Sequence, residues 1–176
     1  MNKLSLIKPF IKTNVFDKCV ISSITDDSRD VQKNSLFVAR QGIASHGKDF
    51  VKEAITRGAS CIITDQNFED SIELPIYCLN NLEDQILEIL FSFHELSADN
   101  YIFHGVTGTN GKTTTAFIAH NIIRELERPS IYIGTLGAFI NDDLIQTKGN
   151  TTPGIFEILQ ILQASKIKQK TYVFLE

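Results

Sequence analysis

Hydrophobic positions in the first half of the chain alternate between strand-like runs and helical spacing, which predicts a small α/β domain. Short apolar and β-branched runs predict strands at residues 35–40, 61–64 and 74–79. Apolar residues at helical spacing predict helices over residues 46–58 and 80–96. Gly58 is placed to end the first helix, and Asn80 or Asn81 can cap the second. We therefore expect a first domain over residues 1–97, with a hinge at "SADN", residues 97–100.

The alternation resumes with a second α/β pattern, which predicts a domain over residues 98–176. A buried strand at 101–106 precedes a glycine-rich segment and a helix that Pro129 closes. One face of that helix carries four apolar residues, Ala119, Ile122, Ile123 and Leu126. Further along, the pattern predicts a strand-like run at 130–140, turn residues at 141–143 and the completion of a hairpin at 144–147. A helix at 154–166 and a strand at 171–176 follow.

Composition restricts the classes of function. Hydrophobic residues make up 43% of the chain and charged residues 22%, as is typical of soluble globular proteins. The net charge of −4 argues against nucleic acid as the main partner. The apolar runs are too short to span a membrane, and the N-terminus lacks a signal-peptide pattern, so we expect a cytoplasmic protein. Three cysteines without a CxxC pair indicate buried thiols rather than a disulfide framework or metal site.

The glycine-rich segment "GVTGTNGKTTT", residues 105–115, lies between the predicted strand and helix. In that setting successive backbone N–H groups and the helix N-terminus converge on one point and bind phosphate. Lys112 can reach the β- and γ-phosphates, and Thr113 is placed to ligate Mg²⁺. The strict G-x-x-x-x-G-K-[ST] pattern is not met, because Val106 occupies the first glycine position. An inert glycine turn is the alternative, but it leaves three threonines at a helix start without a purpose.

This segment resembles the phosphate loop of the Mur ligase family, and the chain from about residue 20 looks closest to the MurE branch of that family. Three further segments agree with the resemblance: "DDSRDVQKNSLFVARQG" at 26–42, "NTTP" at 150–153 and "FLE" at 174–176. The resemblance implies a UDP-sugar-binding first domain followed by the beginning of a P-loop ATPase domain. The family's enzymes have three domains, so we expect this chain to be a fragment with little ligase activity alone.

The resemblance also implies a reaction. ATP would phosphorylate the terminal carboxylate of UDP-N-acetylmuramoyl-L-Ala-D-Glu, and an amino acid amine would displace phosphate from the acyl phosphate. The added residue would be meso-diaminopimelate or L-lysine, and the complete enzyme is expected to act as a monomer. Such phosphoryl transfer depends mainly on positioning and charge neutralisation, which a phosphate loop, a lysine and Mg²⁺ supply.

Site residues follow from the resemblance position by position. The ATP phosphates would contact Gly108, Thr109, Asn110, Gly111, Lys112, Thr113 and Thr114, with Lys112 as the catalytic residue. Magnesium would be held by Thr113 and Glu176. The muramoyl-dipeptide end of the substrate would contact Asn150, Thr151 and Thr152. The uridine diphosphate would contact Asp26, Ser28, Ile43, Ala44 and Ser45.

Simpler interpretations of these segments remain open. Residues 26–28 can form only a turn, a threonine of "NTTP" can act only as a helix cap, and Glu176 can be merely solvated. Competing functions are another amide ligase, such as MurF or folylpolyglutamate synthase, and an unrelated P-loop NTPase or kinase. A non-catalytic module that binds a UDP-sugar or ATP is the alternative outside the enzymes.

Overall fold

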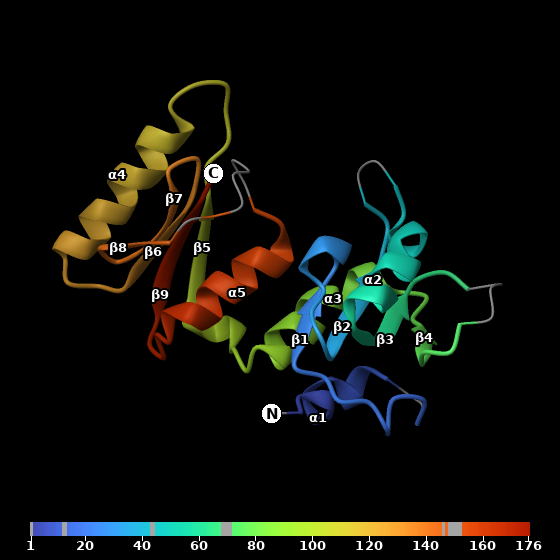
Figure 1. Cartoon of the computed structure of the whole chain (residues 1–176). Helices are drawn as coiled ribbons and strands as arrows, with labels where there is room; N and C mark the ends of the chain where they lie inside the picture. The colour runs from blue at the N-terminus through green and yellow to red at the C-terminus, as the bar shows by residue number, and fades with distance from the viewer. Residues whose placement is uncertain (1, 12–13, 43–44, 68–71, 146, 148–152) are drawn as a thin grey trace. The chain divides into compact units, whose positions relative to one another are not determined.

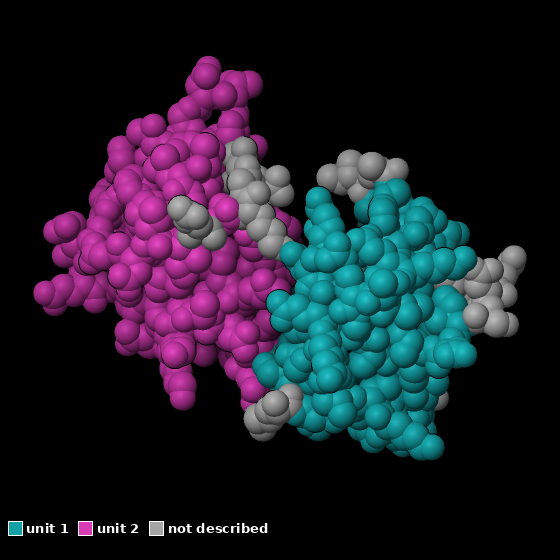
Figure 2. All heavy atoms as spheres, viewed as in Figure 1, with its two compact units in different colours: residues 1–93 teal, residues 94–176 magenta. Residues whose placement is uncertain are grey.

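The computed structural model describes the chain except for residues 1, 12–13, 43–44, 68–71, 146 and 148–152. The chain divides into two compact units, residues 1–93 and 94–176 (Figure 2). Each unit contains its own β-sheet with helices packed on it (Figure 1). None of the helices in the described part of the chain is long and apolar enough to cross a membrane.

The first unit is built on a parallel sheet in the order β1-β2-β3-β4. Its strands are β1 (Ser23–Thr25), β2 (Ser35–Ala39), β3 (Ala59–Thr64) and β4 (Ile76–Cys78). All five residues of β2 are buried, because a central strand of a parallel sheet is covered on both faces. The predicted strands at 35–40, 61–64 and 74–79 are therefore confirmed, whereas β1 was not predicted.

The helices of this unit are α1 (Leu4–Ile7), α2 (Val51–Arg57) and α3 (Leu82–Phe93), with 3-10 turns at Lys8–Phe10, Ser28–Asp30 and Gly47–Phe50. Helix α2 ends at Gly58, whose φ of 107° lies in the left-handed region, as its sequence position predicted. Helix α3 buries an apolar stripe of Leu82, Ile86, Ile89, Leu90 and Phe93. Both helices thus begin and end close to their expected bounds.

The second unit contains a five-stranded sheet in the order β5-β9-β6-β7-β8. Its strands are β5 (Tyr101–Gly105), β6 (Ser130–Gly134), β7 (Gly137–Ile140), β8 (Asp143–Ile145) and β9 (Thr171–Leu175). Strand β9 pairs in parallel with both β5 and β6, while β7 and β8 add antiparallel. The prediction of one strand over 130–140 is wrong, because the chain reverses at Thr135 and Leu136 and Gly137 takes a φ of 101°.

Two α-helices lie on this second sheet, α4 (Lys112–Glu125) and α5 (Ile155–Ser165), and a 3-10 turn spans Ala98–Asn100. Figure 1 shows α4 and α5 on either side of the sheet. Under α4 lies a cluster of Ala116, Tyr132 and Phe174, with Phe117 and Phe139 packed against it. The two helices cover opposite faces of the central strands, which is why all residues of β6 and most residues of β9 are buried.

Candidate functional site

The glycine loop joins the end of β5 to the start of α4, as its sequence setting predicted. Its backbone begins with the Val106 N–H donating to the Leu175 carbonyl at 2.8 Å, which ties the loop to β9. Gly108 has a φ of 146° and Gly111, the residue before α4, has a φ of 78°. Residues with a side chain rarely adopt such positive φ angles, so glycine is required at both positions.

The loop presents its polar groups to solvent, because residues 107–111 are all exposed. Lys112 is the first residue of α4, and its Nζ donates to the Gly108 carbonyl at 2.7 Å. The ammonium group therefore lies over the loop, at the positive end of a helix of 14 residues. This arrangement places the predicted residues 108–114 in the loop and first turn of α4, a setting that can bind an anion.

Glu176 follows β9 beside the loop and is 7% exposed. Its Oε1 accepts hydrogen bonds from the Tyr132 hydroxyl at 2.6 Å and from the Thr135 N–H. Burial raises the pKa of this carboxyl, but hydrogen bonds from Thr113 and from these two donors together hold the pKa below its usual value. Glu176 is thus an ionised, buried carboxylate in contact with the first turn of α4, and the interpretation of a merely solvated side chain is wrong.

Gly134 provides the space for that carboxylate. A Cβ at this position would lie 2.6 Å from the Glu176 Cδ, closer than packed carbon atoms come. The register explains the contact, because Ile133 on β6 pairs with Leu175 on β9, which places the next residue of each strand side by side. A glycine on the neighbouring strand is therefore a condition for the position of Glu176.

The oxygen groups of Thr113 and Glu176 fit a hard divalent cation. Mg²⁺ prefers such ligands and is usually held by one or two protein groups together with waters and phosphate oxygens. Within the described residues there is no group of three or more His, Cys, Asp or Glu side chains that could hold a metal ion. Thr113 and Glu176 are thus oxygen ligands of the kind that Mg²⁺ combines with waters and phosphate oxygens.

The first unit contains a separate cavity of about 560 Å³. It is lined by Asp26, Asp27, Ser28, Arg29, Arg40, Gln41, Gly42, Ser45, Gly47, Phe50 and Glu53. Three residues predicted to contact uridine diphosphate, Asp26, Ser28 and Ser45, thus line one cavity, while the predicted Ile43 and Ala44 lie outside the described residues.

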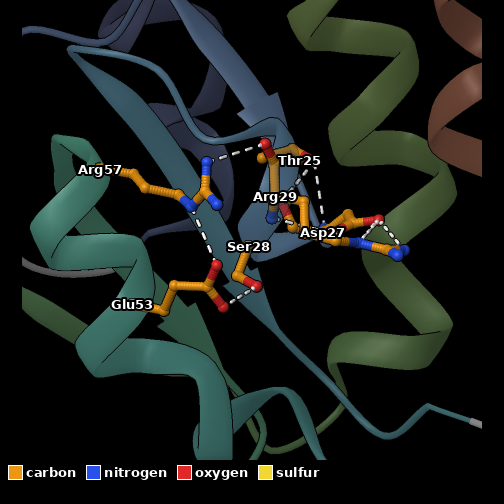
Figure 3. A network of polar contacts seen from close by, with 6 residues as sticks. All are labelled: Thr25, Asp27, Ser28, Arg29, Glu53 and Arg57. Carbon is orange, nitrogen blue, oxygen red and sulfur yellow. Dashed lines mark hydrogen bonds and ion pairs between the residues drawn. The ribbon is translucent and has the colours of Figure 1, made fainter.

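A hydrogen-bond network holds the segment after β1 at this cavity (Figure 3). The buried Ser28 donates its hydroxyl to the Glu53 Oε2 at 2.7 Å, and the Arg57 Nε donates to the other Glu53 oxygen at 2.9 Å (Figure 3). Asp27 accepts from the Arg29 N–H and so caps the following 3-10 turn. The segment is therefore a capped turn, as the simpler interpretation held, and it also lines the cavity.

Arg40 was not predicted as a site residue, yet it links two carboxylates at the cavity. It contacts the Asp26 Oδ2 at 3.0 Å and the Glu83 Oε2 at 3.1 Å. Burial raises the pKa of Asp26, and Arg40 opposes that rise. Glu53 was also missed, although its i,i+4 spacing from Arg57 was visible in the sequence.

The predicted dipeptide-binding residues Asn150, Thr151 and Thr152 lie outside the described residues. The following residues are described, and they show that Gly154 is the N-cap of α5. The alternative that a threonine of "NTTP" caps this helix is therefore wrong.

Two family models match the chain. Residues 20–90 match the model described as "Mur ligase family, catalytic domain", and residues 106–176 match "Mur ligase middle domain". The UDP-N-acetylmuramyl-tripeptide synthetase 2 of Oceanobacillus iheyensis is 33% identical over 157 residues, which cover 89% of this chain and 32% of that protein. A UDP-N-acetylmuramoyl-L-alanyl-D-glutamate–2,6-diaminopimelate ligase of Bacillus cereus is 33% identical over 140 residues, covering 80% of this chain and 28% of that protein. The chain thus spans about a third of the length of these relatives.

Solved structures show the same fold. A UDP-N-acetylmuramoyl-L-alanyl-D-glutamate–2,6-diaminopimelate ligase superposes with a TM-score of 0.73 at 18% identity, over all of this chain and 36% of that chain. A MurF ligase from Thermotoga maritima in complex with ADP superposes with a TM-score of 0.53 at 23% identity, over 87% of this chain and 31% of that chain. At these identities the likeness concerns the fold alone.

Proposed function

Because the chain belongs to the Mur ligase family, we propose that it forms part of an ATP-dependent ligase of peptidoglycan synthesis. The proposed reaction adds the third stem-peptide residue to UDP-N-acetylmuramoyl-L-Ala-D-Glu, and the names of the relatives favour 2,6-diaminopimelate as that residue. The observation that carries the proposal is the strand, glycine loop and helix arrangement of β5 and α4 beside the buried carboxylate of Glu176. ATP and nucleotide sugars are cytoplasmic metabolites, so we expect the protein to act in the cytoplasm.

The second unit would bind ATP and Mg²⁺. Backbone N–H groups of residues 108–114 and the Lys112 ammonium would contact the phosphates, while Thr113 and Glu176 would hold the cation. When bound, Mg²⁺ would neutralise the charge that develops as a phosphoryl group passes to the substrate carboxylate. To contact a phosphate, the Lys112 Nζ would exchange its hydrogen bond with the Gly108 carbonyl for one with a phosphate oxygen.

The first unit would bind the uridine diphosphate end of the substrate. Its cavity combines hydrogen-bond acceptors, such as Asp26 and Ser28, with the guanidinium groups of Arg29 and Arg40. Acceptors suit the N–H and O–H donors of a nucleoside, and guanidinium groups suit a diphosphate. Ile43, Ala44 and Ser45 complete the proposed contacts, and residues 150–152 would hold the dipeptide end.

Calorimetry on the 176-residue chain tests both sites. Because the chain spans about a third of its relatives, binding is the quantity to measure, with Mg-ADP and with UDP-N-acetylmuramoyl-dipeptide as separate ligands. We expect Lys112→Ala to weaken Mg-ADP binding at least about tenfold and to leave the UDP-sugar unaffected. Lys168→Ala, at an exposed lysine, is the matched control. Equal Mg-ADP binding by wild type and Lys112→Ala would refute the nucleotide site, and binding of neither ligand would refute the proposal.

A further inference from the structure

Tyr132 on β6 is fully buried, and its hydroxyl ends at the Glu176 carboxylate. The Phe117 ring contacts the Tyr132 ring edge-on, with centroids 5.3 Å apart and planes at 79°. Phe139 lies beside it, with ring centroids 6.1 Å apart. Rings packed in this way leave the phenol one orientation, because a buried aromatic side chain cannot turn without displacing its neighbours.

The Tyr132 hydroxyl acts as the donor in this contact. An ionised carboxylate can only accept, so the proton of the 2.6 Å hydrogen bond belongs to the phenol oxygen. The phenol oxygen in turn accepts a long hydrogen bond of 3.4 Å from the Leu136 N–H.

Three features together restrict the rotation of the Glu176 carboxylate. Its Oε1 accepts from both Tyr132 and the Thr135 N–H, and the position of Gly134 places backbone against the side chain. The peptide N–H belongs to the turn between β6 and β7 and is fixed by the sheet. The Tyr132 hydroxyl is thus a side-chain donor to Oε1 that a substitution can remove without altering the backbone.

We propose that Tyr132 is a positioning residue, whose hydroxyl fixes the Glu176 carboxylate in the orientation that binds a divalent cation together with Thr113. This inference rests on the proposed function, because it assumes that a cation binds at these two residues. Groups that hydrogen-bond to metal ligands fix ligand orientation, and their removal weakens metal binding about 10- to 100-fold in characterised sites.

Tyr132→Phe tests the inference, because it removes one oxygen and keeps the ring. Mn²⁺ binding to the 176-residue chain with ADP present can be followed by electron paramagnetic resonance of the free ion. We expect wild type to bind Mn²⁺, Glu176→Gln to lose most of that binding, and Tyr132→Phe to weaken it about tenfold or more. Tyr172→Phe is the matched control, since its hydroxyl contacts Arg128 instead of Glu176.

The outcomes separate the inference from the proposed function. If wild type binds no Mn²⁺ above the level of ADP alone, the proposed cation site fails. If wild type binds Mn²⁺ and Tyr132→Phe binds it equally well, the positioning role is overturned while the site stands. The rise of Tm that Mn-ADP causes is the second measurement, and we expect it to shrink in Tyr132→Phe. A Tyr132→Phe chain that is unfolded without metal would assign the hydroxyl to folding and would also overturn the inference.

Discussion

Replacing Gly134 by alanine should disrupt the second unit through one defined clash. The added Cβ would lie 2.6 Å from the Glu176 Cδ, so the carboxylate would have to leave its position. No left-handed φ is recorded for Gly134, and the effect therefore comes from the contact and not from backbone strain. Two donors, the Tyr132 hydroxyl and the Thr135 N–H, would then lose the oxygen that they share.

The magnitude follows from those two donors. A buried donor left without an acceptor costs about 1–3 kcal/mol, and a hydrogen bond to a charged group contributes about 1.5–3 kcal/mol. The Tyr132 hydroxyl is fully buried and bears the first cost, while water can partly replace the acceptor at the exposed Thr135 turn. We expect a loss of about 2–4 kcal/mol, which lowers Tm by at least about 8 °C in a domain of this size.

Thermal unfolding followed by circular dichroism measures the effect, with Gly105→Ala as the control. A Cβ at Gly105 meets no atom within 4 Å, so that variant should unfold like wild type. In a Glu176→Ala background the clashing atoms are absent, and Gly134→Ala should then cost less than about 0.5 kcal/mol. The reasoning is refuted if Gly134→Ala costs as much without the Glu176 carboxylate as with it.

Three further predictions concern other parts of the molecule. His120 is buried and donates to the Asn141 carbonyl at 3.1 Å, and burial lowers the pKa of its ring from 6.5. The folded state therefore favours the neutral ring, and stability falls as the pH drops below 6.5. His120→Gln should flatten the dependence of Tm on pH between about 5 and 7. Gly58→Ala should cost about 1–2 kcal/mol in denaturant unfolding, because its φ is 107°, and an unchanged midpoint would contradict this. Ser28→Ala should weaken UDP-sugar binding about 3- to 10-fold in calorimetry through loss of one hydrogen bond, whereas Glu53→Gln, which retains an acceptor for Ser28, should weaken it less.

The sequence predicted most elements because their signals are local. An apolar stripe such as that of α3, or a glycine at the end of α2, acts within a few residues of itself. Strand β1 escaped prediction because it has three residues, two of them polar, and its burial depends on pairing with β2. The reversal between β6 and β7 escaped because the flanking Ile and Phe residues are apolar on both sides of the turn.

The candidate sites likewise combine contacts that are local in sequence with contacts that are not. The glycine loop could be assembled from sequence because strand, loop and helix follow one another along the chain. The contact of Tyr132 with Glu176 joins residues 44 positions apart, and it depends on β9 lying next to β6. The contact of Ser28 with Glu53 likewise spans 25 positions. Pattern within a segment does not fix strand order, so these partners became visible only in the fold.

The order of the second sheet also bears on how the protein folds during synthesis. Strand β9 is the last of these five strands in sequence, yet it lies between β5 and β6 and is the parallel partner of both. On the ribosome, β5 would therefore wait without a neighbour until residues 171–175 emerge, more than sixty positions after the strand itself was made. Pairing strands so far apart in sequence is slow. The glycine loop cannot be anchored to Leu175 before β9 pairs with β5. A nascent chain should accordingly acquire nucleotide affinity only after residues 171–175 have emerged, and not when the glycines of the loop leave the exit tunnel.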